Sequence, residues 1–230
     1  MAKSLTITPS DGEMLKPAEL VELRGIGPLT LHDRQIFNRL IEAAWGPGMA
    51  DPGREFTVST ATLKHPDVPV SRLVESVERL MQTIVVARRA DGAELRLQLL
   101  GTNTIETTAN GGTLTYSFPP KLAELVRDSS IFAKLDHAVM RSFNSKYAFS
   151  LYEAVAKRIR LRHVFKEDFT VKGIREVLGV EDGKLEPFKN LNQFAIQPAV
   201  SEVNAITPYS VRIEPKKQGR KVVGFVMGWG

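Results

Sequence analysis

The sequence predicts an α+β protein made of two domains that share one architecture, and three observations support this prediction. A tetrapeptide recurs, first as Glu55-Phe56-Thr57-Val58 and again as Asp168-Phe169-Thr170-Val171. Both copies are followed by the same order of predicted elements, namely a short helix, a break, a longer helix and two strands. Each pair of strands encloses a basic turn. A chain of 230 residues is long enough for two domains of ordinary size.

In the first half, apolar residues at helical spacing predict helices over residues 30–45 and 71–81. Thr30 is expected to cap the first of these helices, since an acidic residue, Asp33, follows three positions later. Residues 56–58 are predicted to form a short strand, followed by a helical turn over 60–64. Three further strands are expected, the first two as a hairpin, over 84–87, 94–100 and 113–118.

The middle of the chain is predicted to be helical, over residues 121–127, 131–143 and 146–163. In the second copy, a short helix ends near Leu178, and a longer helical stretch covers 188–206. Pro198 lies inside that stretch, and proline removes one helical hydrogen bond. Both a kinked helix and two short helices satisfy the pattern.

Strand, helix, turn, helix and hairpin, in this order, are typical of a winged helix-turn-helix domain. We therefore expect tandem winged helix-turn-helix domains joined by a helical segment, with boundaries at residues 1–128 and 129–230. The first domain is expected to contact the DNA backbone, to dimerise, or both, and the second to be the main DNA-reading domain. The alternative is two unrelated α+β domains whose elements have the same order by coincidence.

The longer helix of the second copy has two contrasting faces. One face is expected to point to the core, because Phe188, Leu191, Ala195, Ala199, Val203 and Ile206 recur in steps of three and four or multiples of them. The opposite face is rich in amides, and Gln or Asn can pair with adenine in the major groove. The predicted DNA-reading residues are Lys189, Asn190, Gln193, Gln197, Ser201 and Asn204. An ordinary solvated helix face is the alternative.

Two groups of basic residues are predicted to hold DNA phosphates. The turn between the last two strands forms the predicted wing and carries Lys216, Lys217, Arg220 and Lys221. The segment from Arg141 to Arg162 has six cations and one anion, and a helical face within it carries Lys157, Arg158 and Arg162. A solvated helix end and a turn kept for solubility are the alternatives.

Composition is consistent with a cytoplasmic DNA-binding protein. The net charge is +5, with 31 Lys and Arg against 26 Asp and Glu, which favours an anionic partner such as nucleic acid. The chain has no cysteine, no long apolar run that could span a membrane and no secretion signal. No metal, cofactor or membrane partner is expected.

The motifs of several enzyme classes are missing, so no catalytic residue is predicted. Rolling-circle initiators use a His-x-His metal site, and the four histidines are scattered at His32, His65, His137 and His163. The glycines at 48 and 53 have phosphate-loop spacing, but Arg54-Glu55 replaces the required Lys-Ser/Thr. Gly25-Ile26-Gly27 is followed by Pro28 without a preceding strand, which argues against a dinucleotide fingerprint.

Several motifs of the second half, in this order, resemble one known family. They are Ser145-Lys146-Tyr147-Ala148-Phe149-Ser150-Leu151-Tyr152-Glu153, Phe169-Thr170-Val171 with Arg175-Glu176-Val177-Leu178-Gly179-Val180, Pro198-Ala199-Val200-Ser201-Glu202-Val203-Asn204, and Gly219-Arg220-Lys221-Val222. The family is that of the iteron-binding, theta-type plasmid replication initiators, whose members have two winged-helix domains. The similarity begins near Leu29. The reading helix is less basic than is usual in the family, and relatives commonly continue beyond the position of Gly230.

The resemblance implies binding to directly repeated origin sequences (iterons) in double-stranded DNA, which initiates plasmid replication. It also implies a homodimer that represses its own promoter, and contacts with host replication proteins such as the helicase and the host initiator. The weaker contacts of the first domain are then expected at Arg72, Arg79, Arg88 and Arg89. A winged-helix transcriptional regulator without an origin role is the alternative function.

Overall fold

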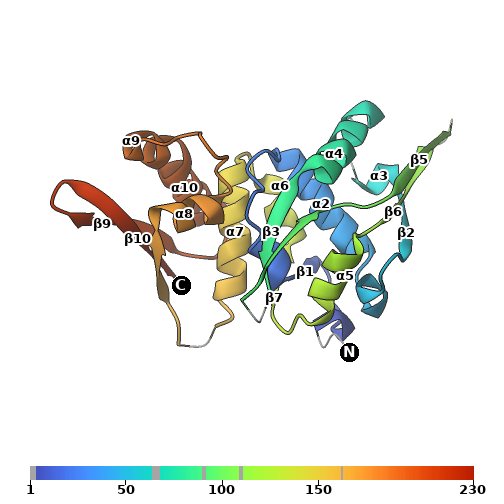
Figure 1. Ribbon diagram of the computed structural model, residues 1–230, viewed down its shortest axis with the longest axis horizontal. Helices are drawn as coiled ribbons and strands as arrows, with labels where there is room; N and C mark the ends of the chain where they lie inside the picture. Colours follow the sequence, from blue (N-terminus) through green and yellow to red (C-terminus); the bar gives the residue numbers. More distant parts are fainter. Residues whose placement is uncertain (1–3, 64–67, 90–91, 109–110, 162) are drawn as a thin grey trace.

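The computed structural model describes residues 4–63, 68–89, 92–108, 111–161 and 163–230. The molecule is elongated, with the N-terminal half at one end of its long axis and the C-terminal half at the other (Figure 1). Helix α7 (Lys146–Arg158) stands between the two halves. The two hairpins that project furthest, β5–β6 and β9–β10, lie at opposite ends of the molecule.

The first half contains the predicted winged-helix order, and the hairpin is confirmed as β3–β4. Its elements are α2 (Leu31–Ala43), β2 (Glu55–Ser59), α3 (Thr60–Leu63), α4 (Val70–Gln82), β3 (Ile84–Arg88) and β4 (Glu94–Gln98). Thr30 caps α2 as predicted. Its hydroxyl accepts a hydrogen bond from the Asp33 amide at 3.2 Å, and the Asp33 carboxylate accepts one from the Thr30 amide at 2.8 Å.

Further elements surround this first winged helix. They are the 3₁₀ turns η1 (Ser4–Thr6) and η2 (Pro47–Ala50), strand β1 (Glu13–Pro17), helix α1 (Ala18–Val21), strands β5 (Asn103–Thr108) and β6 (Gly111–Ser117), and helix α5 (Pro120–Arg127). Strand β6 lies between β2 and β5. The strand that precedes the helices therefore pairs with the inserted β6, and the hairpin β3–β4 forms a sheet of its own.

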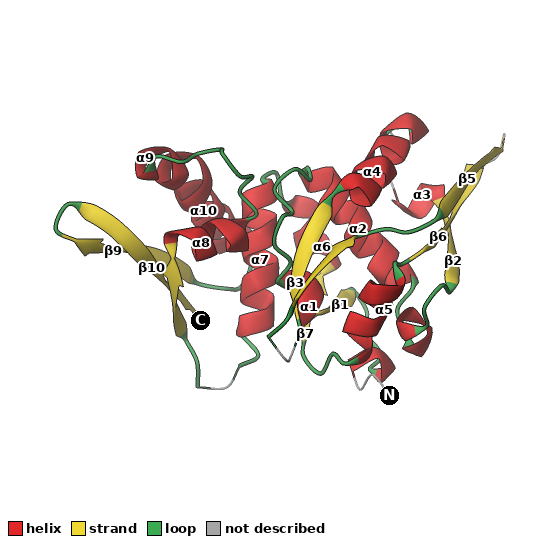
Figure 2. Ribbon diagram, viewed as in Figure 1, coloured by secondary structure: helices red, strands yellow, loops and turns green. Residues whose placement is uncertain are grey.

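The second half repeats the element order of the first, and its first strand pairs with the hairpin, as is usual in a winged helix. After α7 come β8 (Lys166–Thr170), α8 (Val171–Leu178), α9 (Phe188–Leu191), the π-helical turn η3 (Asn192–Ile196), α10 (Gln197–Ile206), β9 (Val211–Gln218) and β10 (Lys221–Trp229). The sheet order is β8-β10-β9, so here the strand before the helices pairs with the hairpin itself. The prediction of tandem winged-helix domains is confirmed, with small sheets distributed around the helices (Figure 2).

The predicted helix over residues 131–143 is wrong in its first half. Residues Phe132–Asp136 form strand β7, and only His137–Ser142 form a helix, α6. Strand β7 pairs antiparallel with β1, with Leu15 opposite Lys134. The distant N-terminal segment thus supplies a strand partner that local sequence preference could not reveal. The pairing joins residues on both sides of the predicted boundary at 128 and 129.

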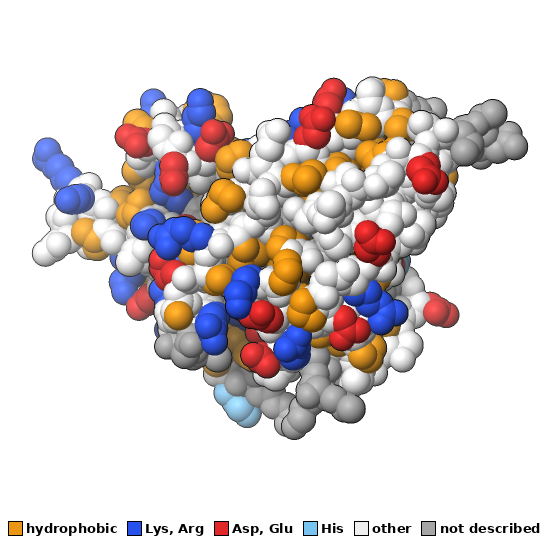
Figure 3. All heavy atoms as spheres, turned by 45° about the vertical axis from the view of Figure 1, so that its right-hand side comes forward, with side chains coloured by type: hydrophobic (Ala, Val, Ile, Leu, Met, Phe, Trp, Pro, Cys, Tyr) orange, Lys and Arg blue, Asp and Glu red, His pale blue; other side chains and the backbone are white. Residues whose placement is uncertain are grey.

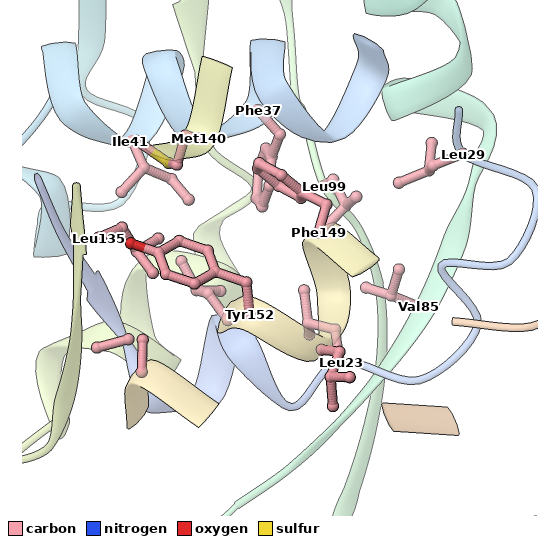
Figure 4. Close-up of a cluster of buried hydrophobic side chains, with 14 of the residues drawn as sticks. Leu23, Leu29, Phe37, Ile41, Val85, Leu99, Leu135, Met140, Phe149 and Tyr152 are labelled. Atoms are coloured by element: carbon pink, nitrogen blue, oxygen red, sulfur yellow. The ribbon is translucent and has the colours of Figure 1, made fainter. Parts of the chain in front are cut away.

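One hydrophobic core runs through both halves. Side chains from α2, β3, α7 and the segment after α1 converge in it, among them Phe37, Val85 and Phe149 (Figure 4). Aromatic contacts continue it into the second half, since the Tyr152 ring stacks on that of Tyr209, with ring centroids 6.0 Å apart. The two winged helices are therefore packed together rather than strung on a linker.

A buried polar cluster crosses this core between α2 and α7. The Lys16 ammonium lies 2.9 Å from both carboxylate oxygens of Glu153, and the Asn38 amide donates to the same carboxylate at 2.6 Å. All three residues are buried, and burial lowers the pKa of Lys16 despite its partner. Removing a buried charge from its partner is costly, because the remaining charge is left unpaired in a low-dielectric interior.

We expect Glu153→Gln to lower the free energy of unfolding by about 3 kcal/mol at neutral pH, measured by urea denaturation. The loss should shrink as the pH rises toward 10.5, the ordinary pKa of lysine. In the variant, the buried Lys16 without its partner loses its proton at a lower pH than a lysine of the unfolded chain. The stability of the variant therefore increases with pH across that window. The control is Glu13→Gln, which removes the partly exposed Glu13–Lys134 pair (3.1 Å) and should cost under about 1 kcal/mol. Equal losses in the two variants would contradict the assignment of the buried pair.

Candidate nucleic-acid interface

The predicted reading helix is continuous from Phe188 to Ile206, and the conflict at Pro198 is resolved by a change of helix type. Pro198 has no amide hydrogen to donate to the carbonyl of Phe194, and its ring would crowd that carbonyl in an α-helix. Immediately before it, residues Asn192–Ile196 form a π-helical turn, in which the Gln197 amide donates to the Asn192 carbonyl. The wider turn accommodates Pro198 without interrupting the helix, so the outer face of one continuous helix is available to a ligand.

The inner face of this helix packs against the core with small and branched residues. Leu191, Ala195, Ala199 and Val203 are fully buried, as predicted, and α10 packs on α7. The two predicted core positions at the ends are less buried. Phe188 is 36% exposed and rests on the Phe225 ring of β10 with centroids 6.1 Å apart. This contact ties the start of the helix to the wing strand behind it.

The outer face carries the predicted amide row. Lys189, Gln193, Gln197 and Ser201 are exposed, and Asn190 is half-buried. The Gln197 amide makes one weak contact, at 3.4 Å, with the Asn192 side chain. The terminal donors and acceptors of this row are thus held on a rigid helix and face solvent, as base contacts in a major groove require.

Asn204 does not fit the predicted reading role. Its side-chain amide donates to the Val211 carbonyl at 3.0 Å, and its oxygen accepts from the Val211 amide at 2.7 Å. One donor hydrogen and one acceptor site of the side chain are therefore used by the first residue of β9, and their geometry orients both atoms toward the backbone and not toward a base. Asn204 fixes the end of the reading helix to the start of the wing instead.

The wing is the hairpin β9–β10, which turns at Gly219 and Arg220. Gly219 has φ +60°, which a two-residue hairpin turn demands at its first central position and which glycine adopts without strain. Lys216, Lys217, Arg220 and Lys221 are all exposed around this tip, and Lys and Arg side chains mark the projecting hairpin in Figure 3. Lys216 forms an ion pair with Asp168 of β8 at 3.0 Å, whereas the other three cations form no ion pair with the described residues.

Two cations of the predicted face at the end of α7 form ion pairs within the protein. Arg158 has 6% of its side chain exposed and pairs with Glu167 at 2.8 Å and with Glu22 at 3.4 Å. Lys157 has 12% exposed and forms an ion pair with Glu22. Both cations thus join the second domain to the N-terminal segment, and neither can reach a phosphate without losing these partners. Arg162, the third predicted residue, lies outside the described residues.

The predicted contacts of the first domain also divide into two classes. Arg79 on α4 makes a two-pronged contact with Asp33, both bonds at 2.9 Å, and these hydrogen bonds raise the pKa of Arg79. This contact holds α4 against the start of α2, and a phosphate would have to compete with the Asp33 carboxylate for Arg79. Arg72, Arg88 and Arg89 are exposed on α4 and at the end of β3, where a DNA backbone could be reached.

An exposed aromatic ring on the reading helix was missed by the sequence analysis. Phe194 lies within the π-helical turn, next to Gln193, and is 54% exposed. The signal was present in the sequence, because Phe194 falls outside the series of core positions with three- and four-residue spacing. An apolar residue there was overlooked because only polar residues were considered as contacts.

Neither a metal site nor a membrane-spanning helix is found in the described ranges. No group of three or more His, Asp or Glu side chains is arranged to hold a metal ion there. No described helix has the length and apolar character required to cross a membrane.

Comparison with known proteins bears on the identity of the chain. No curated protein sequence matches it. Among solved structures, the crystal structure of Pi initiator protein in complex with iteron DNA superposes with a TM-score of 0.68 at 18% identity, covering 96% of this chain and 98% of that one. A structure of domains 2 and 3 of RctB gives a TM-score of 0.51 at 8% identity, covering 99% and 95%.

Two family models match the sequence itself. Residues 170–229 match the model described as "Initiator Rep protein, WH2". Residues 14–156, more than half of the chain, match the model described as "Initiator Replication protein, WH1". The two matches fall on the two winged helices of the structure in the expected order. The chain belongs to the family of initiator replication proteins.

Proposed function

We propose that the chain binds directly repeated sequences, iterons, in double-stranded DNA at a plasmid origin and thereby initiates replication. The observation that carries the proposal is the exposed amide row of the reading helix beside a basic wing. The likeness of the whole chain to an initiator bound to iteron DNA supports it. No catalytic step is part of the proposed role.

In this proposal the second winged helix reads the sequence. The helix from Phe188 to Ile206 enters the major groove with Gln193 and Gln197 toward the bases, and Lys189, Asn190 and Ser201 beside them. The wing cations Lys217, Arg220 and Lys221 neutralise phosphates. Lys216 shares its charge with Asp168 and contributes less.

The first winged helix is proposed as a second, weaker grip. Its exposed cations Arg72, Arg88 and Arg89 are suited to backbone contacts. The exposed positions of α4 also include Glu75 and Glu78, which makes this helix a poor phosphate ligand. A role in forming a homodimer, in self-repression or in contacting the host helicase and initiator belongs to the same proposal. The division at residues 128 and 129 stays a prediction.

Footprinting on the DNA that flanks the gene tests the proposal. Initiation predicts protection of tandem direct repeats beside an AT-rich tract, with opening of that tract when protein is added. A transcriptional regulator without an origin role predicts protection of a promoter palindrome alone. The absence of protected repeats, together with normal replication of the replicon when the gene is deleted, would refute an initiator role.

We expect the triple variant Lys217→Ala/Arg220→Ala/Lys221→Ala to weaken binding to all duplex sequences alike. The slope of log affinity against log salt should fall by roughly 0.9 per lost phosphate contact, hence by about 2 to 3. The measurement is fluorescence anisotropy at several salt concentrations. The matched control is Lys121→Ala/Lys134→Ala, an exposed lysine of α5 and a partly exposed lysine of β7, which should leave the slope unchanged. Equal slopes for wild type and the wing variant would remove the wing from the interface.

We expect Gln193→Ala to change base preference and Asn204→Ala to change stability. Gln193→Ala should change the preferred base at one or two positions and leave unfolding unaffected, because its side chain is exposed. Asn204→Ala leaves the Val211 backbone groups without partners, which should cost about 1 to 3 kcal/mol of stability. Binding selection from a random-sequence library and urea denaturation separate the two effects. A change of base preference in Asn204→Ala without loss of stability would restore it to the reading set.

A further inference from the structure

We infer that Phe194 is a specificity-determining residue whose ring contacts the methyl group of thymine in the major groove, beside the bases met by Gln193 and Gln197. This inference deepens the proposed function and rests on it. It names the base feature that the apolar part of the reading helix recognises.

The first support is the position of the ring. Phe194 is 54% exposed, although the residues that follow it, Ala195 and Ile196, are fully buried. It takes part in none of the aromatic pairs found among the described residues, whereas Phe188 is braced against Phe225. Leaving a large ring in water costs free energy in proportion to its apolar area. The ring therefore exposes more than half of its surface on the reading helix, next to Gln193 in the chain.

The second support is the backbone beneath the ring. Phe194 lies in the π-helical turn closed by the bond from the Gln197 amide to the Asn192 carbonyl. Gln193 and Phe194 are neighbours in this turn, and both side chains are exposed. Because the turn is anchored by Ala195 and Ile196 in the core, the ring is presented in a fixed place. A recognition residue needs such a rigid support.

The third support is the chemistry of the groove. The C5-methyl of thymine is the apolar group that a base pair offers in the major groove, while cytosine presents an amino group and guanine two acceptors. A phenyl ring that covers a donor or acceptor removes its water and gives no hydrogen bond in return, which is unfavourable. Gln193 or Gln197 can meanwhile pair with an adenine. Amides next to a ring thus select neighbouring A·T pairs.

The experiment uses a duplex selected from a random-sequence library by the wild-type full chain. The same sequence is then prepared with uracil in place of thymine at single positions, which removes one methyl group at a time. Wild type should lose roughly fourfold in affinity at one or two positions, the value of one buried methyl or methylene. Phe194→Ala should bind the thymine duplex more weakly and show no difference between thymine and uracil at those positions. Phe194→Leu should retain part of the difference.

A second substitution tests the same contact in the opposite direction. Cytosine placed at the sensitive position should weaken binding, and 5-methylcytosine should restore part of the loss for wild type but not for Phe194→Ala. Phe165→Ala is the matched control, because Phe165 is 67% exposed but lies before β8, outside the reading helix. It should keep the full sensitivity to uracil. Thermal unfolding of each variant shows that the exposed substitutions leave the fold intact.

The outcomes separate this inference from the proposed function. If wild type selects no sequence and binds all duplexes alike, the proposed function fails. If it selects a sequence but responds equally to thymine and uracil at every position, only the role of Phe194 is refuted. Sensitivity to uracil that persists undiminished in Phe194→Ala would assign the methyl contact to another residue and also refute the inference.

Discussion

The buried contact between α2 and α7 fixes how the two winged helices sit relative to each other. Each of these helices carries polar residues into the shared core. Glu153 of α7 binds Lys16 and Asn38, and Arg34 of α2 reaches the other way, to Ser150 and to the Gly179 carbonyl. Burial lowers the pKa of Arg34 to about 10, so it stays charged at neutral pH. Lys16 and the two terminal nitrogens of Arg34 find their partners in a single arrangement of α2 and α7.

The buried contact between α2 and α7 also explains why a glycine, Gly179, follows the end of α8. Gly179 adopts φ +63° to end the helix, and a side chain there would come within 2.8 Å of the Arg34 guanidinium. The carbonyl that Arg34 binds is thus exposed by the same residue that ends the helix. Because α8 and the reading helix belong to one domain, the buried contact between α2 and α7 also fixes the position of the reading helix.

Local signals allowed the elements to be predicted, but not their partners. The cap at Thr30 and the periodicity of α4 act within a few residues, and both predictions were confirmed. Strand β7 was predicted as helix because its partner β1 lies more than a hundred residues away. In the same way β2 pairs with β6, although β8, its counterpart in the second domain, pairs with the wing strand β10. A sequence pattern indicates the local conformation of a segment, but it does not indicate which strand pairs with that segment.

The same limit governed the predicted site. Charge density suggested Lys157 and Arg158 as phosphate ligands, and the family resemblance suggested Arg79, yet each of them forms an ion pair with a carboxylate of the same chain. Lys217, Arg220 and Lys221 at the wing tip remain exposed because the two-stranded hairpin projects from the molecule, and no ion pair links them to the described residues. Of the predicted contacts, those on projecting or outward surfaces kept their solvent exposure, and those near the middle of the molecule became structural. For a chain whose net charge is only +5, the location of each cation therefore matters more than the total. A wing with three unshared cations and a rigid, amide-bearing helix can bind DNA even though much of the remaining positive charge holds the two domains together.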